Sequence, residues 1–393
     1  MRVTVFGGGM ITHDQILPSV YQLQRLGLVD EIAICARHDQ TLRVLSDSPQ
    51  LKVAFPGQAF RSNVGPYRDA LRATPPRNVA VIALPDHLHF DAVMAALEAD
   101  QHVLVVKPLV MKLEEAETIE REALRRDLFV GVEYHKRFDD RSLMARRKYR
   151  AGEFGEFRLG SACLMEKWYY RHSNFQNWCT TENSDAFAYI GCHYVDLVHF
   201  ITGLSPVSVS VYGVKDEYPN GNEGFLWTDA RIIWSNGACL NVQNSLSFPD
   251  DAPGTNTQGL TLYCASRTNG ALIRHSDQYR GVEHVYTTRP EAPGATIYAE
   301  PSPDYFQYVD LGNGGLTPVG YGYRSIEYLF RCCLRVENAP DRQQAIRGID
   351  REAIVATPAN SSYNEQVIEA ARRSIRNGGA PVSVSSGTRT AQK

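Results

Sequence analysis

A lysine at the end of an apolar stretch is the first residue of this sequence whose position suggests chemistry. Val103–Val106 is a continuous apolar run of the kind that forms a parallel strand buried on both faces, and Lys107 and Pro108 follow it directly. Ligands of open α/β sheets bind just outside the carboxyl ends of the strands. Pro108 also favours an extended backbone at Lys107. We therefore expect the Lys107 ammonium to face a ligand, although a solvated lysine at a strand end would give the same pattern.

A glycine-rich turn near the start of the chain suggests a second binding feature. Arg2–Phe6 is predicted to be a strand, and it leads into Gly7-Gly8-Gly9-Met10-Ile11-Thr12. Gly7 and Gly9 match the first two glycines of G-x-G-x-x-G, a pattern that lets a pyrophosphate approach the backbone at a helix N-terminus. Thr12 stands where the pattern has its third glycine. The predicted dinucleotide site includes Gly7, Gly9, Met10 and Ile11.

The end of the second predicted strand, Glu31–Cys35, indicates which dinucleotide would bind. NAD-selective folds place an acidic residue there to bind the ribose 2′-hydroxyl, whereas this chain continues with Ala36 and Arg37. A guanidinium can bind a 2′-phosphate through two hydrogen bonds, so Arg37 favours NADP over NAD. Asp39 follows closely enough to reach the ribose, which leaves NAD, or the use of both cofactors, open.

Polar and aromatic residues also gather in the second half of the chain. Residues 188–203 are predicted to form a helix on which His193 and Asp196 share one side. Upstream, residues 167–178 interleave aromatic rings with Asn, Lys and Arg. This composition suits a carbohydrate, because rings stack on the CH surfaces of a sugar while polar groups bind its hydroxyls. The candidate substrate-binding residues here are Lys167, Tyr169 and Trp178, although an aromatic packing cluster would explain the same residues.

Two patterns predict the elements that position these residues. Over residues 1–135 strands and helices alternate, which indicates a doubly wound parallel sheet of the Rossmann type. Its strand at residues 79–84 ends in a loop that carries Leu84, Pro85, His87 and His89. From residue 156 onward, alternating β-branched and aromatic stretches with turns such as Ser235-Asn236-Gly237 predict a large, mostly antiparallel sheet.

The expected fold class is therefore α/β, with an N-terminal doubly wound Rossmann sheet and a C-terminal α+β domain. We predict a dinucleotide-binding domain over residues 1–135 and a substrate-binding and oligomerisation domain over residues 136–360. Residues 361–393 should form a C-terminal helix, a short strand and a tail. An exposed face of the second sheet would favour a homo-oligomer, a dimer or a tetramer.

Composition narrows the classes of partner and location. The 393 residues carry a net charge of −3, which gives no electrostatic case for binding nucleic acid or anionic membranes. No apolar run approaches the roughly 20 residues that span a bilayer. The eight cysteines form no C-x-x-C pair, so no metal site is predicted. With a strand starting almost at Met1, we expect no signal peptide and a cytoplasmic protein.

The motifs together resemble the Gfo/Idh/MocA family, which includes glucose–fructose oxidoreductase and inositol dehydrogenase. The family's pattern is a T-P-x-x-x-H loop, a helix and then G-K-H-V-x-x-E-K-P. This chain has Leu84–His89 and His102–Pro108 at those places, with Val106 in the position of the glutamate. The family's D-x-x-x-H-x-x-D helix is matched at His193 and Asp196, with Tyr189 in the position of the first aspartate.

The resemblance implies an NAD(P)-dependent oxidoreductase that transfers a hydride between a nicotinamide cofactor and a secondary hydroxyl of a sugar, polyol or glycoside. It implies that His193 is the general acid/base, that Lys107 binds the substrate oxygen and that Tyr189 positions the substrate. Cofactor contacts are expected from Lys107 and from the loop residues Leu84, Pro85, His87 and His89, of which the two histidines would equally serve as loop caps. Two alternatives stay open, namely a glycosidase that recycles its bound NAD and a non-catalytic NADP-binding sensor.

Overall fold

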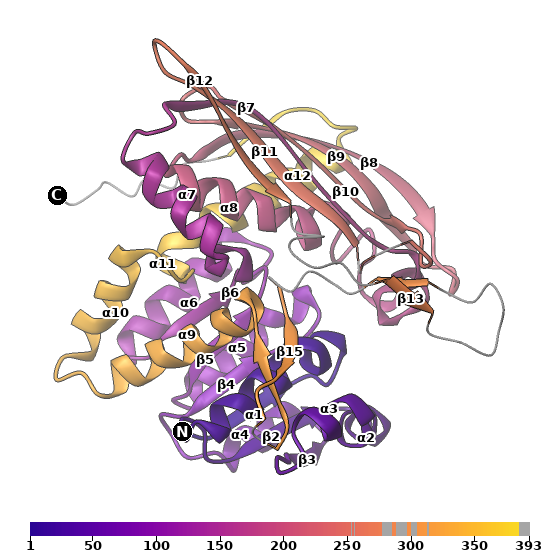
Figure 1. The fold of residues 1–393 in the computed structure, drawn as a ribbon, viewed down its shortest axis with the longest axis vertical. Helices are drawn as coiled ribbons and strands as arrows, with labels where there is room; N and C mark the ends of the chain where they lie inside the picture. The colour runs from indigo at the N-terminus through magenta and orange to yellow at the C-terminus, as the bar shows by residue number, and fades with distance from the viewer. Residues whose placement is uncertain are drawn as a thin grey trace. The chain divides into compact units, whose positions relative to one another are not determined.

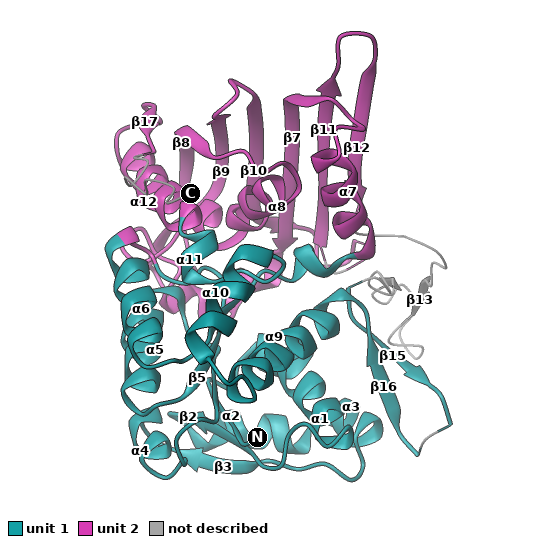
Figure 2. Cartoon of the chain, turned by 90° about the vertical axis from the view of Figure 1, so that its left-hand side faces the viewer, with its two compact units in different colours: residues 1–110, 114–139, 303–362 teal, residues 111–113, 140–302, 363–393 magenta. Residues whose placement is uncertain are grey.

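The chain divides into two compact units, which Figure 2 colours separately. This computed structural model describes residues 1–252, 254, 256–276, 285–287, 297–299, 305–312 and 314–384. Unit 1 comprises residues 1–110, 114–139 and 303–362, and unit 2 comprises residues 111–113, 140–302 and 363–393. The division differs from the predicted boundaries, because residues 303–362 belong to the first unit and not to the second. The predicted tail, residues 385–393, lies outside the described residues.

Unit 1 is built on a six-stranded sheet in which every pair of neighbours is parallel (Figure 1). The strand order is β3-β2-β1-β4-β5-β6. Strands β2 and β3 are therefore added on one side of β1, and strands β4 to β6 on its other side. This is the order of doubly wound dinucleotide-binding folds, and it confirms the predicted Rossmann sheet. The strands are β1 (Val3–Phe6), β2 (Ile32–Ala36), β3 (Arg61–Val64), β4 (Val79–Ile82), β5 (His102–Val106) and β6 (Val130–Glu133).

Segments from two separate parts of the chain complete unit 1 around this sheet. The segments before residue 140 are the π-helical turn η1 (Thr12–Ile16), α1 (Leu17–Arg25), α2 (Asp39–Asp47), α3 (Pro49–Ala54), α4 (Tyr67–Arg72), η2 (Asp86–Leu88), α5 (His89–Glu98), α6 (Leu113–Arg125) and η3 (His135–Phe138). The later segments are β15 (Gln307–Asp310), β16 (Leu316–Val319), α9 (Tyr321–Glu337), α10 (Arg342–Glu352) and α11 (Pro358–Ser361). Helix α9 packs on α1, β6 and η3 and buries Ile326, Leu329 and Phe330 in the same core as Val3, Val5 and Leu104. This packing explains why residues 303–362 belong to unit 1.

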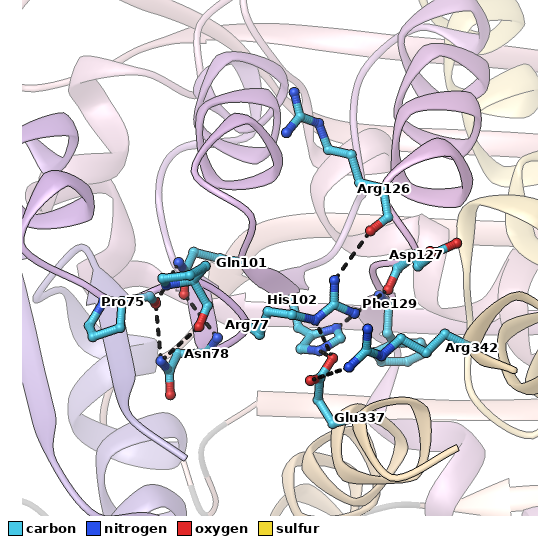
Figure 3. Close-up of polar contacts among 11 residues, drawn as sticks. Pro75, Arg77, Asn78, Gln101, His102, Arg126, Asp127, Phe129, Glu337 and Arg342 are labelled. Carbon is cyan, nitrogen blue, oxygen red and sulfur yellow. Dashed lines mark hydrogen bonds and ion pairs between the residues drawn. The ribbon is translucent and has the colours of Figure 1, made fainter. Parts of the chain in front are cut away.

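A cluster of charged side chains ties the amino ends of the strands to the end of α9 (Figure 3). We call Arg77, His102, Glu337 and Arg342 the amino-edge cluster. Glu337 Oε1 lies 2.7 Å from Arg77 Nε and 2.9 Å from His102 Nε2. The Phe129 amide donates to His102 Nδ1 at 3.0 Å, so the hydrogen of the neutral ring is on Nε2.

The charges of this cluster depend on one another. Burial alone would raise the pKa of Glu337, but the hydrogen bonds from His102 and Arg77 hold that pKa at about 2. Burial lowers the pKa of His102, and the neighbouring Glu337 carboxylate opposes this effect only in part. The cluster therefore combines a carboxylate, two guanidinium groups and a neutral imidazole at neutral pH.

Unit 2 is built on a seven-stranded, mostly antiparallel sheet of order β12-β11-β7-β10-β9-β8-β17, which confirms the second part of the predicted fold. The one parallel pair among these strands joins β7 and β10. The strands are β7 (Glu156–Lys167), β8 (Pro206–Glu217), β9 (Glu223–Trp234), β10 (Cys239–Phe248), β11 (Asn256–Ala265), β12 (Gly270–Ser276) and β17 (Val382–Ser383), and β13 (Val285–Thr287) pairs separately with β14 (Ile297–Ala299). The predicted turn at Ser235-Asn236-Gly237 joins β9 to β10, with Trp234 N donating to Ala238 O at 2.9 Å.

Helices of unit 2 lie against one side of this sheet, as Figure 1 shows for α8 and α12. The helical segments are α7 (Asp140–Arg150), η4 (Trp168–His172), η5 (Asn174–Asn177), the π-helical turn η6 (Phe187–Gly191), α8 (Cys192–Thr202) and α12 (Tyr363–Arg376). Leu197 and Ile201 of α8 and Val367 of α12 share a core with Leu240 and Leu262 of the sheet. Among the residues that the structure describes, no helix has the length and apolar character that crossing a membrane would need.

Candidate active site

The glycine loop lies at the carboxyl end of β1, where the order of the strands reverses. Gly7 has a φ of +101°, and a Cβ at this position would lie 2.1 Å from the Ala83 carbonyl oxygen, so only glycine fits. A Cβ at Gly9 would meet nothing within 4 Å, so the backbone there faces open space. Thr12 is buried, and its hydroxyl donates to the Gly7 carbonyl at 2.8 Å, which closes the loop without the third glycine.

This loop fits the pyrophosphate of a dinucleotide. The turn η1 and α1 follow it without a break, so the positive end of a helical segment faces the open space at Gly9. Arg37, which is exposed, directly follows β2. It lies beside the loop, because Gly7 N donates to the Cys35 carbonyl at 2.9 Å. Asp39 lies 2.5 Å from Arg43 in an ion pair, so its carboxylate already has a cationic partner.

The ends of β4 and β5 are held together by His89. This buried ring places Nε2 2.8 Å from the Leu84 carbonyl and Nδ1 2.8 Å from the Pro108 carbonyl. Through these two contacts the ring fixes the backbone after both strands and therefore the base of Lys107, which is partly exposed and precedes a cis peptide bond to Pro108. Both ring nitrogens of His89 face backbone carbonyls, and this arrangement argues against the predicted contact of His89 with a cofactor. His87, by contrast, is exposed.

In unit 2 the predicted aromatic residues form one contiguous cluster. The Tyr169 and Tyr170 rings stack with their centroids 4.8 Å apart, and Tyr170 meets Phe175 edge-on at 5.0 Å. Phe175 in turn contacts Trp178 at 4.8 Å and Tyr189 at 4.7 Å. Trp178 is only 8% exposed, whereas Tyr169 is 45% exposed. The cluster therefore joins three predicted substrate residues, with packing dominant at Trp178 and an open ring at Tyr169.

His193 lies in the first turn of α8 and is 6% exposed. Tyr189, four residues earlier, belongs to the π-helical turn η6, a type of turn that is frequent at functional sites. The buried Asp196 accepts hydrogen bonds from the Tyr363 hydroxyl at 2.8 Å and from Asn364 Nδ2 at 3.2 Å. Asp196 therefore joins α8 to α12, and the candidate chemistry on this helix rests on Tyr189 and His193.

Lys167 has a different environment from the one predicted. Its ammonium donates to three backbone carbonyls, those of Pro249 at 3.0 Å, Asp250 at 3.0 Å and Ala252 at 2.5 Å. Burial lowers the pKa of Lys167, while Asp250 and Asp251 act in the opposite direction. An ammonium has three hydrogens, and all three are used here. This arrangement argues against the predicted substrate contact and gives Lys167 a role in holding the loop after β10.

Two segments of this chain match models of a single protein family. Residues 1–134 match an oxidoreductase family with an NAD-binding Rossmann fold, and residues 142–266 match the GFO/IDH/MocA C-terminal domain. The chain belongs to the Gfo/Idh/MocA oxidoreductase family. The resemblance inferred from its motifs is therefore confirmed, and both matched segments agree with the fold described above.

Individual relatives within the Gfo/Idh/MocA family are distant. A D-glucoside 3-dehydrogenase of Escherichia coli is 22% identical over 70% of this chain and 81% of its own length. An NADP-dependent scyllo-inositol 2-dehydrogenase of Bacillus subtilis is 28% identical over 20% of this chain and 22% of its own length. The chain spans about half or less of the length of the first curated relatives that it matches. The solved scyllo-inositol dehydrogenase of Lactobacillus casei, which has NAD(H) and scyllo-inositol bound, shares the fold with a TM-score of 0.65 at 13% identity, over 98% of this chain and 99% of its own.

The predicted residues of this Gfo/Idh/MocA chain fall into two groups. Gly7, Gly9, Leu84, Pro85 and Lys107 meet at the carboxyl edge of the parallel sheet in unit 1, whereas Tyr169, Trp178, Tyr189 and His193 lie in unit 2. Sequence reasoning missed one buried carboxylate at the first of these places. Glu133 is the last residue of β6 and the register partner of Val106, the position where the family motif has its glutamate. The absence of that glutamate was the signal that could have prompted a search on the neighbouring strand.

Proposed function

We propose that this chain is an NAD(P)-dependent dehydrogenase acting on a secondary hydroxyl group of a sugar, polyol or glycoside. The observation that carries the proposal is the glycine loop, whose open space at Gly9 lies at the same sheet edge as Lys107. The family membership supports the reaction type. The printed activities of the relatives, on a D-glucoside and on scyllo-inositol, support a ring hydroxyl as the reacting group.

The proposed roles follow from what each side chain can do. When bound, the nicotinamide supplies the group that accepts or donates the hydride. His193 takes the hydroxyl proton as general base and returns it in the reverse direction. Lys107 donates a hydrogen bond to the same oxygen and stabilises its negative charge, while Tyr189 orients the substrate. The exposed ring of Tyr169 offers a stacking surface to a sugar, and Trp178 is connected to it through Phe175 and Tyr170.

Within this proposal NADP is favoured over NAD. The exposed Arg37 beside the glycine loop can bind a 2′-phosphate, and the only nearby acid named for the ribose, Asp39, pairs with Arg43. Relatives and solved neighbours include proteins named for each cofactor. Contacts of Met10, Ile11, Leu84, Pro85 and His87 with the cofactor remain predictions, and so does a cytoplasmic location.

We also propose that the chain forms a homo-oligomer through the open face of the sheet in unit 2. Cross-strand pairing places one apolar row on that face: Ile233, Cys239, Leu159, Tyr263 and Leu272 follow one another in register across five strands. Leu159 and Tyr263 are each 52% exposed and Leu272 is 47% exposed. Contiguous exposed apolar surface of this kind marks an interface. Light scattering on Leu159→Glu should show a smaller assembly than the wild type, and an unchanged mass would argue against this face.

The proposed function is tested with the purified protein. Ultraviolet absorbance and mass spectrometry of the released small molecule would show whether a nicotinamide cofactor co-purifies, and a panel of polyols and glycosides would then be screened for its reduction. Lys107→Ala and His193→Ala should each lower kcat by at least about 100-fold, and His193→Ala should do so while sparing cofactor binding. Lys52→Ala, which changes an exposed lysine paired with Asp47, serves as the matched control.

Three outcomes would redirect the proposal. Unchanged turnover in both Lys107→Ala and His193→Ala would refute the assigned roles. Release of reducing sugar without net NADH would identify the glycosidase with a recycled cofactor. Cofactor binding without any substrate-dependent absorbance change across the whole panel would favour the non-catalytic sensor.

A further inference from the structure

A buried carboxylate ends β6 at the same sheet edge as the glycine loop. Glu133 is 4% exposed, and each of its oxygens has a partner within unit 1. Oε1 accepts from Gln15 Nε2 at 2.9 Å and from the Ser325 hydroxyl in a short contact. Oε2 lies 3.0 Å from His135 Nδ1. We call Gln15, Glu133, His135 and Ser325 the Glu133 cluster. A buried charge is tolerated when it is paired in this way.

Gln15 connects this carboxylate to the glycine loop. Gln15 is fully buried, and its Nε2 donates to Glu133 and also to the Gly322 carbonyl at 3.0 Å, while its Oε1 accepts from the Tyr305 hydroxyl at 2.9 Å. Gln15 belongs to the same π-helical turn as Thr12, whose hydroxyl closes the glycine loop at Gly7. The turn that faces the open space at Gly9 is therefore anchored at its far end by Glu133.

His135 completes the cluster on the other side. A carboxylate only accepts hydrogen bonds, so the contact with Glu133 places a hydrogen on Nδ1 of the ring. The ring packs against Tyr305 and Tyr321, with centroid distances of 5.1 and 5.7 Å. Glu133 thus connects η1, η3 and α9 at one point.

The position of Glu133 accounts for the unexpected valine in the lysine-proline motif. Val106 and Glu133 are register partners in neighbouring parallel strands, so their side chains project from the same face of the sheet. Strands lie about 4.8 Å apart, and two carboxylates at that spacing would repel each other strongly. Of the two partners, only position 133 carries a carboxylate in this chain.

We propose that Glu133 is a positioning residue for the cofactor: it supplies the carboxylate that the motif lacks at Val106 and, through Gln15, holds the turn that follows the glycine loop. The inference rests on the proposed function, because it takes the open space at Gly9 as the pyrophosphate site. Helix N-terminal amides stabilise a phosphate only when they point at it, so a turn that shifts loses this contact. Glu133 itself acts through Gln15 and touches neither substrate nor cofactor in this scheme.

The first test compares two carboxylates of the same unit, each of which is bonded to a histidine. Calorimetric titration with NADP and with NAD should show that Glu133→Gln and Gln15→Ala each raise the dissociation constant by about tenfold, the usual effect of one lost hydrogen bond to a charged group. Glu337→Gln in the amino-edge cluster of Figure 3 is the matched control, since it also removes a carboxylate bonded to a histidine but at the opposite edge of the sheet. It should lower the melting temperature and leave the dissociation constant unchanged.

The second test moves the carboxylate. Val106→Glu and Glu133→Val should each weaken cofactor binding, the first by repulsion and the second by loss of the anchor. The double variant again has one carboxylate at this pair of positions, so it should bind within about threefold of the wild type. The effects of two substitutions at interacting neighbours are not additive, and this double-mutant cycle measures the difference. If Glu133→Val does not fold, Glu133→Gln in the Val106→Glu background replaces it in the same cycle.

The outcomes separate the inference from the function on which it rests. A wild-type protein that binds neither NAD nor NADP would overturn the proposed function. Wild-type binding that Glu133→Gln and Gln15→Ala leave unchanged, or that Glu337→Gln weakens equally, would overturn the positioning role alone. Strictly additive losses in the double variant would overturn the replacement of the motif carboxylate.

Discussion

Replacing Glu337 by glutamine should make the acid stability of unit 1 measurably different from that of the wild type. Glu337 is the acceptor at the centre of the amino-edge cluster, where it binds Arg77 and His102. Glutamine keeps a similar shape and one acceptor oxygen but removes the charge. The bonds from Arg77 and His102 then lose their charge assistance, while the Arg77 bonds to the carbonyls of Arg126 and Asp127, at 3.4 and 2.8 Å, stay as they are. The variant should therefore fold and be less stable at neutral pH.

The magnitude follows from the pKa of Glu337. A value of about 2 in the folded protein, against 4.5 in the unfolded chain, corresponds to about 3 kcal/mol of stability for this carboxylate, which is only 19% exposed. Because the folded pKa is depressed, this contribution is complete above pH 4.5 and is lost as the pH falls towards 2. His102, whose pKa is also depressed by burial, adds a loss of stability below its unfolded value of 6.5. Removing the Glu337 charge would lower the pKa of His102 further, so this loss is larger in the variant.

The assay has to report on unit 1 alone. All four tryptophans, Trp168, Trp178, Trp227 and Trp234, lie in unit 2, so their fluorescence would follow the wrong part of the chain. Protection of the β5 amides against hydrogen exchange, corrected for intrinsic rates, gives the free energy of opening for the parallel sheet. The difference between wild type and Glu337→Gln should be about 3 kcal/mol at pH 7 and should shrink steadily below pH 4.5. A difference that stays constant from pH 7 to pH 3 would refute the charge-based reasoning.

Four further substitutions give sharp expectations. Gly9→Val should fold normally, because the added side chain meets open space, but calorimetry should show cofactor binding weakened by about 100-fold or more. Gly7→Ala should instead lower the melting temperature, because its Cβ would lie 2.1 Å from a carbonyl oxygen. Lys167→Met keeps the apolar stem but leaves three carbonyls without their donor. It should lower the free energy of unfolding by about 2 kcal/mol and speed proteolysis at residues 249–252. An unchanged cleavage rate would contradict the role of Lys167 in holding this loop. Arg37→Ser should weaken NADP binding by about tenfold and leave NAD binding unchanged, and equal effects on the two titrations would remove the argument for NADP.

The fold could be predicted from sequence wherever a local pattern determines it. Apolar runs such as Val103–Val106 and the turn at Ser235-Asn236-Gly237 specify their strands through nearby residues alone, and the observed elements agree. The division into units could not be predicted in this way. Helix α9 joins unit 1 through contacts such as the bond between Gln15 and Gly322, which are 307 positions apart. Nothing in the composition of residues 303–362 distinguishes a helix that covers the first sheet from one that covers the second.

The candidate site was predictable to the extent that its chemistry depends on the backbone. Gly7 must be glycine because of its φ and its closeness to Ala83, and this constraint is visible as a sequence motif. Side-chain roles were less predictable, because the donors that suit a ligand also suit a carbonyl. His89 binds carbonyls 5 and 19 positions away, and Lys167 binds carbonyls more than 80 positions away. Histidine and lysine in a loop beside a site therefore look alike in sequence whether they hold a ligand or the loop itself.

The Val106 position shows how a motif can lose a group that the site keeps. In a parallel strand, moving a side chain by one residue along the chain turns it to the opposite face, whereas moving it to the register partner on the next strand keeps the face. Glu133 is that partner, and its bonds to Gln15 and Ser325 place the charge beside the turn after the glycine loop. A motif that is read along one strand therefore records a missing glutamate, although the sheet edge still carries a carboxylate. In this chain, Val106 should therefore be judged together with Glu133, because a glutamate at position 106 would be repelled by the carboxylate on the next strand.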